Sequence, residues 1–119
     1  MSERSDEIFD REALLNAIGN NKKLMAELIK IYMEKSPDFL SQIQDAIARK
    51  DRDSLRFSAH ALRGMSLNVF AHGVARVTWA LEEMGENDNL SHAEKAFATL
   101  EREIRRLKRA FKPLTGEKQ

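Results

Sequence analysis

Apolar side chains recur at intervals of three and four residues over most of the chain, the spacing that gathers them on one face of an α-helix. No stretch alternates apolar and polar residues in the manner of a half-buried β-strand. Only five glycines and two prolines interrupt the helical pattern. The pattern therefore predicts an all-α protein.

The first two predicted helices have clear start signals. Asp10 has the side chain of an N-cap, and the short helix that follows it is expected to end at Gly19. A long helix begins near Asn21, and Pro37 predicts either a kink or a new start within it. The apolar series of this long helix is Leu24, Leu28, Ile31, Tyr32, Phe39, Leu40, Ile43 and Ile47.

Three further helices follow. Asp51 is expected to cap the third helix, and Gly85 to end the fourth. Ser91 and Glu94 have the spacing of a capping box at the start of the fifth. Trp79, in the fourth helix, is expected to pack in or beside the core. The predicted buried stripes are Leu55, Ala59, Leu62, Ser66 and Val69 in the third helix, Val74, Val77, Leu81 and Met84 in the fourth, and Ala93, Phe97, Leu100, Ile104, Leu107 and Phe111 in the fifth.

Short connections between long helices predict that neighbouring helices are antiparallel. The expected fold is an antiparallel up-down four-helix bundle with a short additional N-terminal helix. We expect residues 10–112 to form this bundle, with a flexible, solvated lead-in over residues 1–9 and a flexible tail over residues 113–119. A chain of 119 residues can bury its own core, so a monomer is expected.

Composition excludes several classes of function. Lys and Arg number 20 and Asp and Glu 19, so the net charge of +1 indicates neither nucleic acid nor membrane as a partner. The absence of cysteine excludes disulfides and thiolate catalysis. No apolar run approaches the roughly 20 residues of a membrane span, and the N-terminus is too polar for a signal peptide, so a cytoplasmic location is expected. His60, His72 and His92 lack the spacing of metal ligands, and no metal site is predicted.

The third predicted helix carries a second stripe, about 100° from its buried one. This stripe consists of Arg56, His60, Arg63, Gly64 and Leu67. Glycine inside a helix costs about 1 kcal/mol relative to alanine, but its missing side chain would let the backbone of a partner approach His60. A neutral imidazole is a nucleophile near neutral pH, and Arg63, with Arg56 as a weaker candidate, can stabilise a phosphoryl group. The stripe therefore predicts phosphoryl transfer centred on His60.

The segment "AHALRG", residues 59–64, resembles the His-x-Leu-Lys/Arg-Gly signature of histidine-containing phosphotransfer (HPt) domains. The specific resemblance covers roughly residues 9–85, and it implies the helical bundle already expected. It also implies that His60 is the phosphoacceptor, that Arg63 is the family's basic residue and that Gly64 is the small residue that admits a receiver domain. The family often has a small residue, commonly glycine, where this chain has Phe70.

The resemblance implies a phosphorelay intermediate that takes a phosphoryl group from a receiver-domain aspartate and passes it to another receiver, with no kinase activity of its own. Its partners would be receiver domains of response regulators or hybrid histidine kinases. It would need no cofactor, because Mg²⁺ belongs to the receiver. Leu67, with Met65 and Phe70 nearby, is expected to contact the receiver.

The alternative interpretation is a helical adaptor that binds a receiver or another signalling protein and carries no phosphate. Phe70 is the feature that favours it, because a bulky residue stands at a position that is usually small in the family. The two hypotheses differ at His60, since an adaptor should tolerate its replacement.

Overall fold

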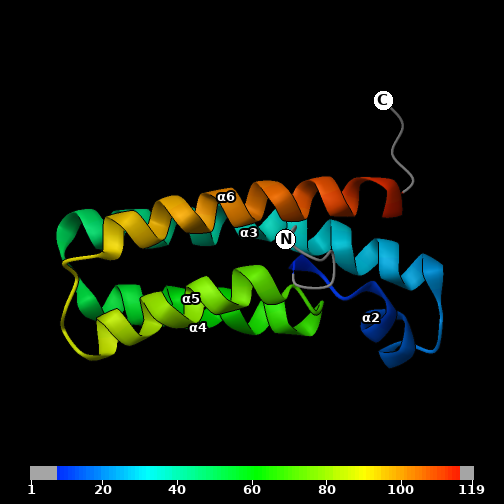
Figure 1. Ribbon diagram of the computed structural model, residues 1–119, viewed down its shortest axis with the longest axis horizontal. Coiled ribbons are helices and arrows are strands. Elements are labelled where there is room, and N and C mark those ends of the chain that lie inside the picture. Colours follow the sequence, from blue (N-terminus) through cyan, green and yellow to red (C-terminus); the bar gives the residue numbers. More distant parts are fainter. Residues whose placement is uncertain (1–7, 116–119) are drawn as a thin grey trace, which may run out of the picture.

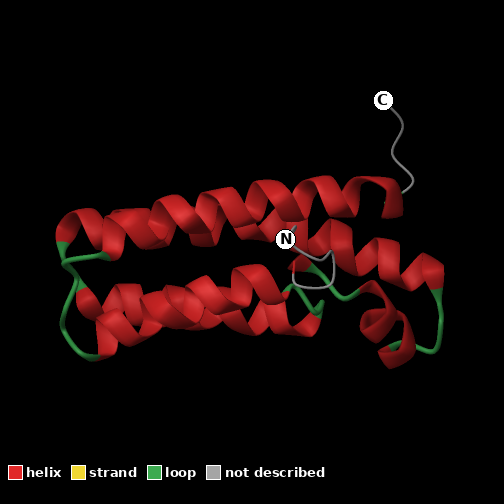
Figure 2. Cartoon of the chain, viewed as in Figure 1, coloured by secondary structure: helices red, strands yellow, loops and turns green. Residues whose placement is uncertain are grey.

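Helices form the architecture of residues 8–115, the part of the chain that this computed structural model describes (Figures 1 and 2). No strand occurs in this range. Most of the predicted lead-in and tail, residues 1–7 and 116–119, lies outside it. The helices are α2 (Arg11–Ala17), α3 (Lys22–Arg49), α4 (Arg52–Asn68), α5 (His72–Glu86) and α6 (Ala93–Phe111), followed by the single 3₁₀ turn η1 (Lys112–Leu114).

The four long helices form a closed bundle. Each contacts the next in sequence, and α3 also contacts α6. Successive long helices run in opposite directions, with α3 and α6 side by side above α4 and α5 in the view of Figure 1. The short helix α2 packs against α3 at one end of the bundle. The predicted four-helix bundle with an additional N-terminal helix is confirmed.

The predicted N-caps Asp10 and Asp51 are present, and Asn21, near which the long helix was expected to begin, is its N-cap. The carboxylate of Asp10 accepts a hydrogen bond from the backbone N–H of Ala13 at 3.0 Å, and that of Asp51 accepts one from Ser54 at 3.1 Å. Asn21 accepts one from Leu24 at 2.9 Å. Each cap supplies an acceptor to one of the N–H groups that the first turn of a helix leaves without a partner.

Of the two alternatives predicted at Pro37, the structure excludes a new helix start, because Pro37 lies inside the continuous helix α3. The predicted capping box of α6 is also absent, because α6 begins at Ala93 and no side chain caps it. Instead, the hydroxyl of Ser91 donates to the side-chain oxygen of Asn89 at 2.9 Å and stabilises the preceding turn.

Gly85 does not end α5, which continues to Glu86. It is a point of close contact between α5 and α4. A Cβ added at Gly85 would lie 2.8 Å from the carbonyl oxygen of Arg52 and 3.0 Å from the backbone nitrogen of Arg56. Only glycine therefore permits this approach of the two backbones.

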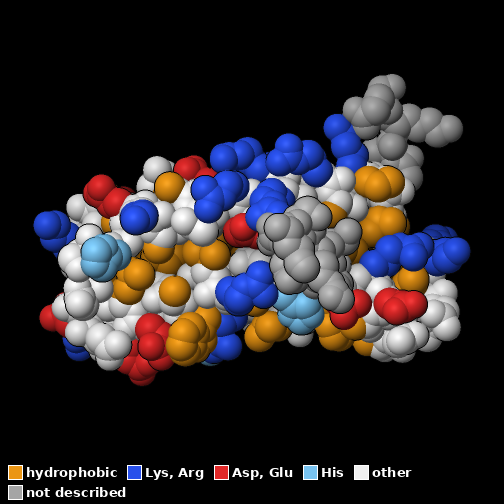
Figure 3. All heavy atoms as spheres, viewed as in Figure 1, with side chains coloured by type: hydrophobic (Ala, Val, Ile, Leu, Met, Phe, Trp, Pro, Cys, Tyr) orange, Lys and Arg blue, Asp and Glu red, His pale blue; other side chains and the backbone are white. Residues whose placement is uncertain are grey.

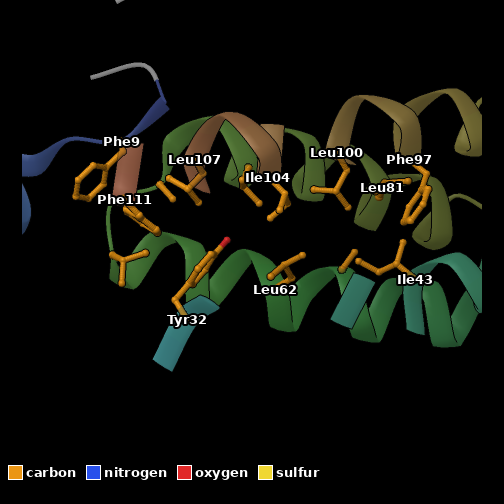
Figure 4. Packing of buried hydrophobic residues seen from close by; sticks show 14 of the residues in the cluster. Phe9, Tyr32, Ile43, Leu62, Leu81, Phe97, Leu100, Ile104, Leu107 and Phe111 are labelled. Atoms are coloured by element: carbon orange, nitrogen blue, oxygen red, sulfur yellow. The ribbon is translucent and has the colours of Figure 1, made fainter. Parts of the chain in front are cut away.

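The buried stripes of α4 and α6 are confirmed, and Figure 4 shows Leu62 of α4 facing Leu100 and Ile104 of α6 across the core. In α5, Val74 and Leu81 are buried, whereas Val77 and Met84 are half-buried against the core. The stripe predicted for the first half of α3 is partly wrong: Leu24 and Ile31 are exposed. The residues of that half that are buried are Met25, Ile29, Tyr32 and Ser36.

Aromatic residues close the end of the bundle beside α2. The ring of Phe9 meets that of Phe111 edge to face, with 4.8 Å between centroids, and Tyr32 packs against the other side of Phe111 (Figure 4). The prediction of a solvated lead-in is therefore wrong at Ile8 and Phe9, which pack on the core. The tail boundary is wrong as well, because Leu114 also packs there.

Basic side chains gather along α6 on the face shown in Figure 3. Residues 102–112 include six Lys and Arg residues, of which Lys108 and Arg109 lie in the last turn of the helix. Cations at this end interact favourably with the negative end of the helix dipole.

A buried hydrogen bond joins α3 to α4. The hydroxyl groups of Tyr32 and Ser66 are 2.7 Å apart, and Ser66 donates its own proton to the carbonyl oxygen of Leu62. Tyr32 is therefore the donor to Ser66. Burial raises the pKa of Tyr32 from 10.0 to about 12.

We predict that Tyr32→Phe changes how stability depends on alkaline pH. Because the pKa is higher in the folded state, the contribution of Tyr32 is full below pH 10 and is lost as pH rises towards 12, up to about 3 kcal/mol. Urea denaturation between pH 8 and 12 should show a steeper loss of unfolding free energy in the wild type than in Tyr32→Phe. Parallel curves for the two proteins would contradict this assignment.

We also predict opposite effects for alanine at two helical glycines. Gly85→Ala should lower the free energy of unfolding by about 1–3 kcal/mol, because its Cβ meets the backbone of α4. Gly64→Ala should raise it by up to about 1 kcal/mol, because nothing lies within 4 Å of the added Cβ. Urea denaturation of both variants measures the difference, and equal effects at the two positions would refute the packing role of Gly85.

Candidate functional site

His60 lies in the middle of α4, on the side of the helix that faces away from the core. The neighbouring Ala59 and Leu62 are fully buried and fix the rotation of α4. The side chain of His60 is 65% exposed. The exposed position predicted from the helical spacing is thus confirmed.

A carboxylate from α5 holds His60 and Arg63 together. Oε2 of Glu82 is 2.9 Å from Nδ1 of His60, and its Oε1 accepts a hydrogen bond from Nε of Arg63 at 2.9 Å. Glu82 thereby bridges two residues that lie one turn apart on α4. Sequence reasoning missed this residue, because no local pattern indicates which α5 side chain reaches His60.

The contacts at Nδ1 determine which ring nitrogen is available for chemistry. An ionised carboxylate only accepts hydrogen bonds, so the 2.9 Å contact with Glu82 places a proton on Nδ1 of His60. The guanidinium of Arg63 is farther away, 3.4 Å from the same nitrogen, and can only donate. In the neutral ring Nε2 therefore keeps its lone pair.

Glu82 is ionised in this arrangement. Burial raises the pKa of Glu82, but the hydrogen bonds from Arg63 and then His60 outweigh it and hold the pKa below the usual value. Its side chain is 17% exposed, so the carboxylate is also sheltered from water. Partial burial and two hydrogen-bond donors hold the Glu82 carboxylate in one orientation, and the contact with Nδ1 in turn orients the ring of His60.

Two other predicted residues have different surroundings. Gly64 leaves open space one turn from His60, with no atom within 4 Å of where a Cβ would be. Arg56 is exposed, and within residues 8–115 it forms no hydrogen bond to His60 or Glu82. The structure thus brings Arg63, and not Arg56, into contact with the histidine.

The predicted apolar contacts differ in accessibility. Leu67 is 44% exposed, whereas Met65 and Phe70 are half-buried against the core. Trp79, expected in or beside the core, is instead 52% exposed on the outer face of α5. The preceding residue, Thr78, is buried instead, although the sequence pattern did not assign Thr78 to the core.

Phe70 follows α4 in a left-handed backbone conformation, with φ of 60°. Glycine adopts this region without strain, which explains why glycine is common at this position in HPt domains. The backbone carbonyl of Phe70 accepts a hydrogen bond from the N–H of Asp10 at 3.0 Å. The turn is thus kept, with phenylalanine in place of the small residue.

Within residues 8–115, no three His, Cys, Asp or Glu side chains are grouped so that they could hold a metal ion. The same part of the chain contains no helix long and apolar enough to cross a membrane.

Comparison with known proteins gives one consistent result. The model of the family described as "Hpt domain" matches residues 27–110. The phosphorelay intermediate protein rdeA of Dictyostelium discoideum is 24% identical over 96 residues, which cover 81% of this chain and 38% of that protein. The chain therefore spans well under half the length of this relative.

A solved structure has the same fold. The crystal structure of histidine-containing phosphotransfer protein B (HptB) from Pseudomonas aeruginosa PAO1 matches with a TM-score of 0.85 at 23% identity. The match covers 94% of this chain and 97% of that one. The two proteins thus share the same fold over nearly their whole length.

We predict that Glu82→Ala changes the tautomer of the neutral His60 ring. Without the carboxylate, Arg63 is the remaining donor near Nδ1, so the proton should move to Nε2 in most molecules. Two-bond ¹H–¹⁵N NMR spectra of the imidazole ring distinguish the two forms. Glu83→Ala removes the adjacent carboxylate and should leave the wild-type tautomer; an Nδ1–H ring in Glu82→Ala would contradict the role of Glu82.

Proposed function

Because the chain belongs to the Hpt domain family, we propose that it is a phosphorelay intermediate with His60 as the phosphoacceptor. The observation that carries this proposal is the bond from Nδ1 of His60 to Glu82, which leaves Nε2 as the free nucleophile on a 65% exposed ring. The names of the two similar proteins, a phosphorelay intermediate and a histidine-containing phosphotransfer protein, support it.

The chemistry balances without a further reactant. The lone pair of Nε2 attacks the phosphorus of an aspartyl phosphate, and the bond from phosphorus to the aspartate oxygen breaks. The products are a free aspartate carboxylate and a phosphoimidazole ring that still holds its proton on Nδ1. Glu82 stabilises the positive charge that this ring acquires, because its carboxylate already accepts that proton in a hydrogen bond. Transfer to a second receiver is the reverse reaction.

The other residues of the stripe assist this step. Arg63 is fixed by Glu82 beside the ring, where its remaining N–H groups can donate to the phosphoryl oxygens. Gly64 provides the clearance through which the receiver backbone approaches. Arg56 contributes only long-range positive charge.

The partners in this proposal are receiver domains of response regulators or hybrid histidine kinases. The protein itself is a phosphocarrier with no kinase activity, and it needs no metal of its own. Mg²⁺ is held by carboxylates of the receiver, as expected for a hard cation next to a phosphoryl group. We propose that it acts as a monomer in the cytoplasm.

Labelling of His60 tests the proposal. A receiver domain carrying a labelled aspartyl phosphate, in the presence of Mg²⁺, should transfer an acid-labile, base-stable label to the wild type. His60→Gln should remove all label, because no other nucleophile lies in the stripe. His92→Gln, which replaces another exposed histidine, should be labelled as well as the wild type.

Two outcomes would refute the proposal. A label that survives in His60→Gln would place the phosphoacceptor elsewhere. Receivers that bind the wild type but never label it would identify the protein as an adaptor. Circular dichroism of each variant confirms that the helices are intact.

A further inference from the structure

A shallow groove of about 610 Å³ lies between α4 and α5 next to the proposed phosphoacceptor. Leu67 and Trp79, two of the large apolar side chains that are exposed in the structure, line it from the two helices. Its basic side chains are Arg63, His72 and Arg76. The groove thus combines an exposed tryptophan with positive charge.

The groove is continuous with the site at His60. Arg63 lines the groove and also donates to Glu82, the carboxylate that holds the ring of His60. Trp79 lies three residues before Glu82, which is about one helical turn. A partner whose phosphoryl group reaches Nε2 of His60 must therefore cover or closely approach this groove.

The opposite side of His60 has another character. Phe57 is 70% exposed there, in a hollow between α3 and α4. The charged side chains of that hollow are Asp45, Asp53 and Arg49, and Arg49 is already paired with Asp45. An exposed aromatic residue is thus present on both sides of the histidine, but only the groove beside Trp79 is lined by basic side chains without carboxylates.

Charge complementarity selects the occupant. A receiver carries its phosphoryl group on an aspartate, beside the carboxylates that hold Mg²⁺, so the surface it presents to His60 is acidic. The lining of the Trp79 groove holds Arg63 and Arg76 and no carboxylate, although Arg63 is paired with Glu82 beside the groove. The hollow beside Phe57 holds two aspartates against one arginine, so the groove fits an acidic surface better than the hollow does.

We propose that Trp79 is the anchor that receiver domains bind in the groove between α4 and α5, and that it determines which receivers this chain accepts. This proposal rests on the proposed function. Tryptophan and arginine are the side chains that most often dominate the binding energy of an interface. His60 is not among the residues that line the groove with Trp79, so we expect Trp79 to act on docking and not on the transfer step.

The chain contains a single tryptophan, so its fluorescence reports directly on the groove. Titration with a receiver domain that lacks tryptophan should shift the emission of Trp79 to shorter wavelength, as the half-exposed ring is covered. In transfer from the same phosphorylated receiver, Trp79→Ala should raise KM roughly tenfold or more, the loss typical of a truncated anchor. Its kcat at saturating receiver should remain within about twofold of the wild type.

Phe57→Ala is the matched control, because it removes an exposed aromatic ring from the other side of His60. It should leave both KM and kcat within about twofold. Phosphoramidate, a small phosphodonor that needs no docking surface, should label the wild type, Trp79→Ala and Phe57→Ala equally.

The outcomes separate this inference from the proposed function. If Trp79→Ala keeps the KM of the wild type while His60→Gln abolishes labelling, the groove proposal is overturned and the phosphorelay function stands. A raised KM in Phe57→Ala together with an unchanged Trp79→Ala would place the receiver on the acidic side and overturn it too. If no donor labels the wild type, both proposals fail.

Discussion

The geometry of the site depends on the close approach of α4 and α5. Gly85 allows it, because any larger residue would collide with the backbone of α4 near Arg52 and Arg56. Glu82 lies one turn before Gly85, so the same approach brings its carboxylate to 2.9 Å from both His60 and Arg63. A wider spacing of the two helices would weaken this bridge, which holds the ring of His60. Glycine inside α5 lowers the stability of the helix, but it permits the helix contact that orients the ring of His60.

The turn after α4 shows how the fold tolerates backbone strain. A left-handed backbone costs a residue with a side chain roughly 1–2 kcal/mol, yet Phe70 adopts it. Val69 and Ala71 on either side are buried, which fixes the path of the chain, and the Phe70 carbonyl accepts the N–H of Asp10. The N-terminal helix is thereby attached to the end of the helix that carries His60. The bulky side chain packs half-buried against the core rather than over the histidine, so it does not weigh against phosphotransfer.

Sequence periodicity predicted what a single helix determines by itself. The exposed stripe of His60, Arg63 and Gly64 follows from the rotation of α4, which its own apolar residues fix. Glu82 and Trp79 could not be assigned in this way, because their roles depend on how α5 is rotated and placed against α4. Glycine at position 85 was ambiguous for the same reason: near a helix end it has the signature of a stop signal, and only the neighbouring backbone reveals a packing contact. Local hydrogen bonds are similarly ambiguous, since a serine can cap a helix or close the turn before it.

The two nitrogens of the His60 imidazole ring have different surroundings. Nδ1 faces a sheltered carboxylate whose position is set by helix packing, and the side chain is 65% exposed, so in the proposed function a receiver reaches Nε2 from the exposed side. This arrangement suits a carrier that both accepts and releases a phosphoryl group. The carboxylate stabilises the positive charge of the phosphorylated ring, while the phosphoryl group itself stays accessible to a partner. A site that enclosed the phosphoryl group would stabilise the phosphorylated histidine, which favours accepting the group and slows its release to the next receiver. In the proposed function, selectivity has to come from surfaces beside the ring, and the charged side chains on the two sides of His60 differ.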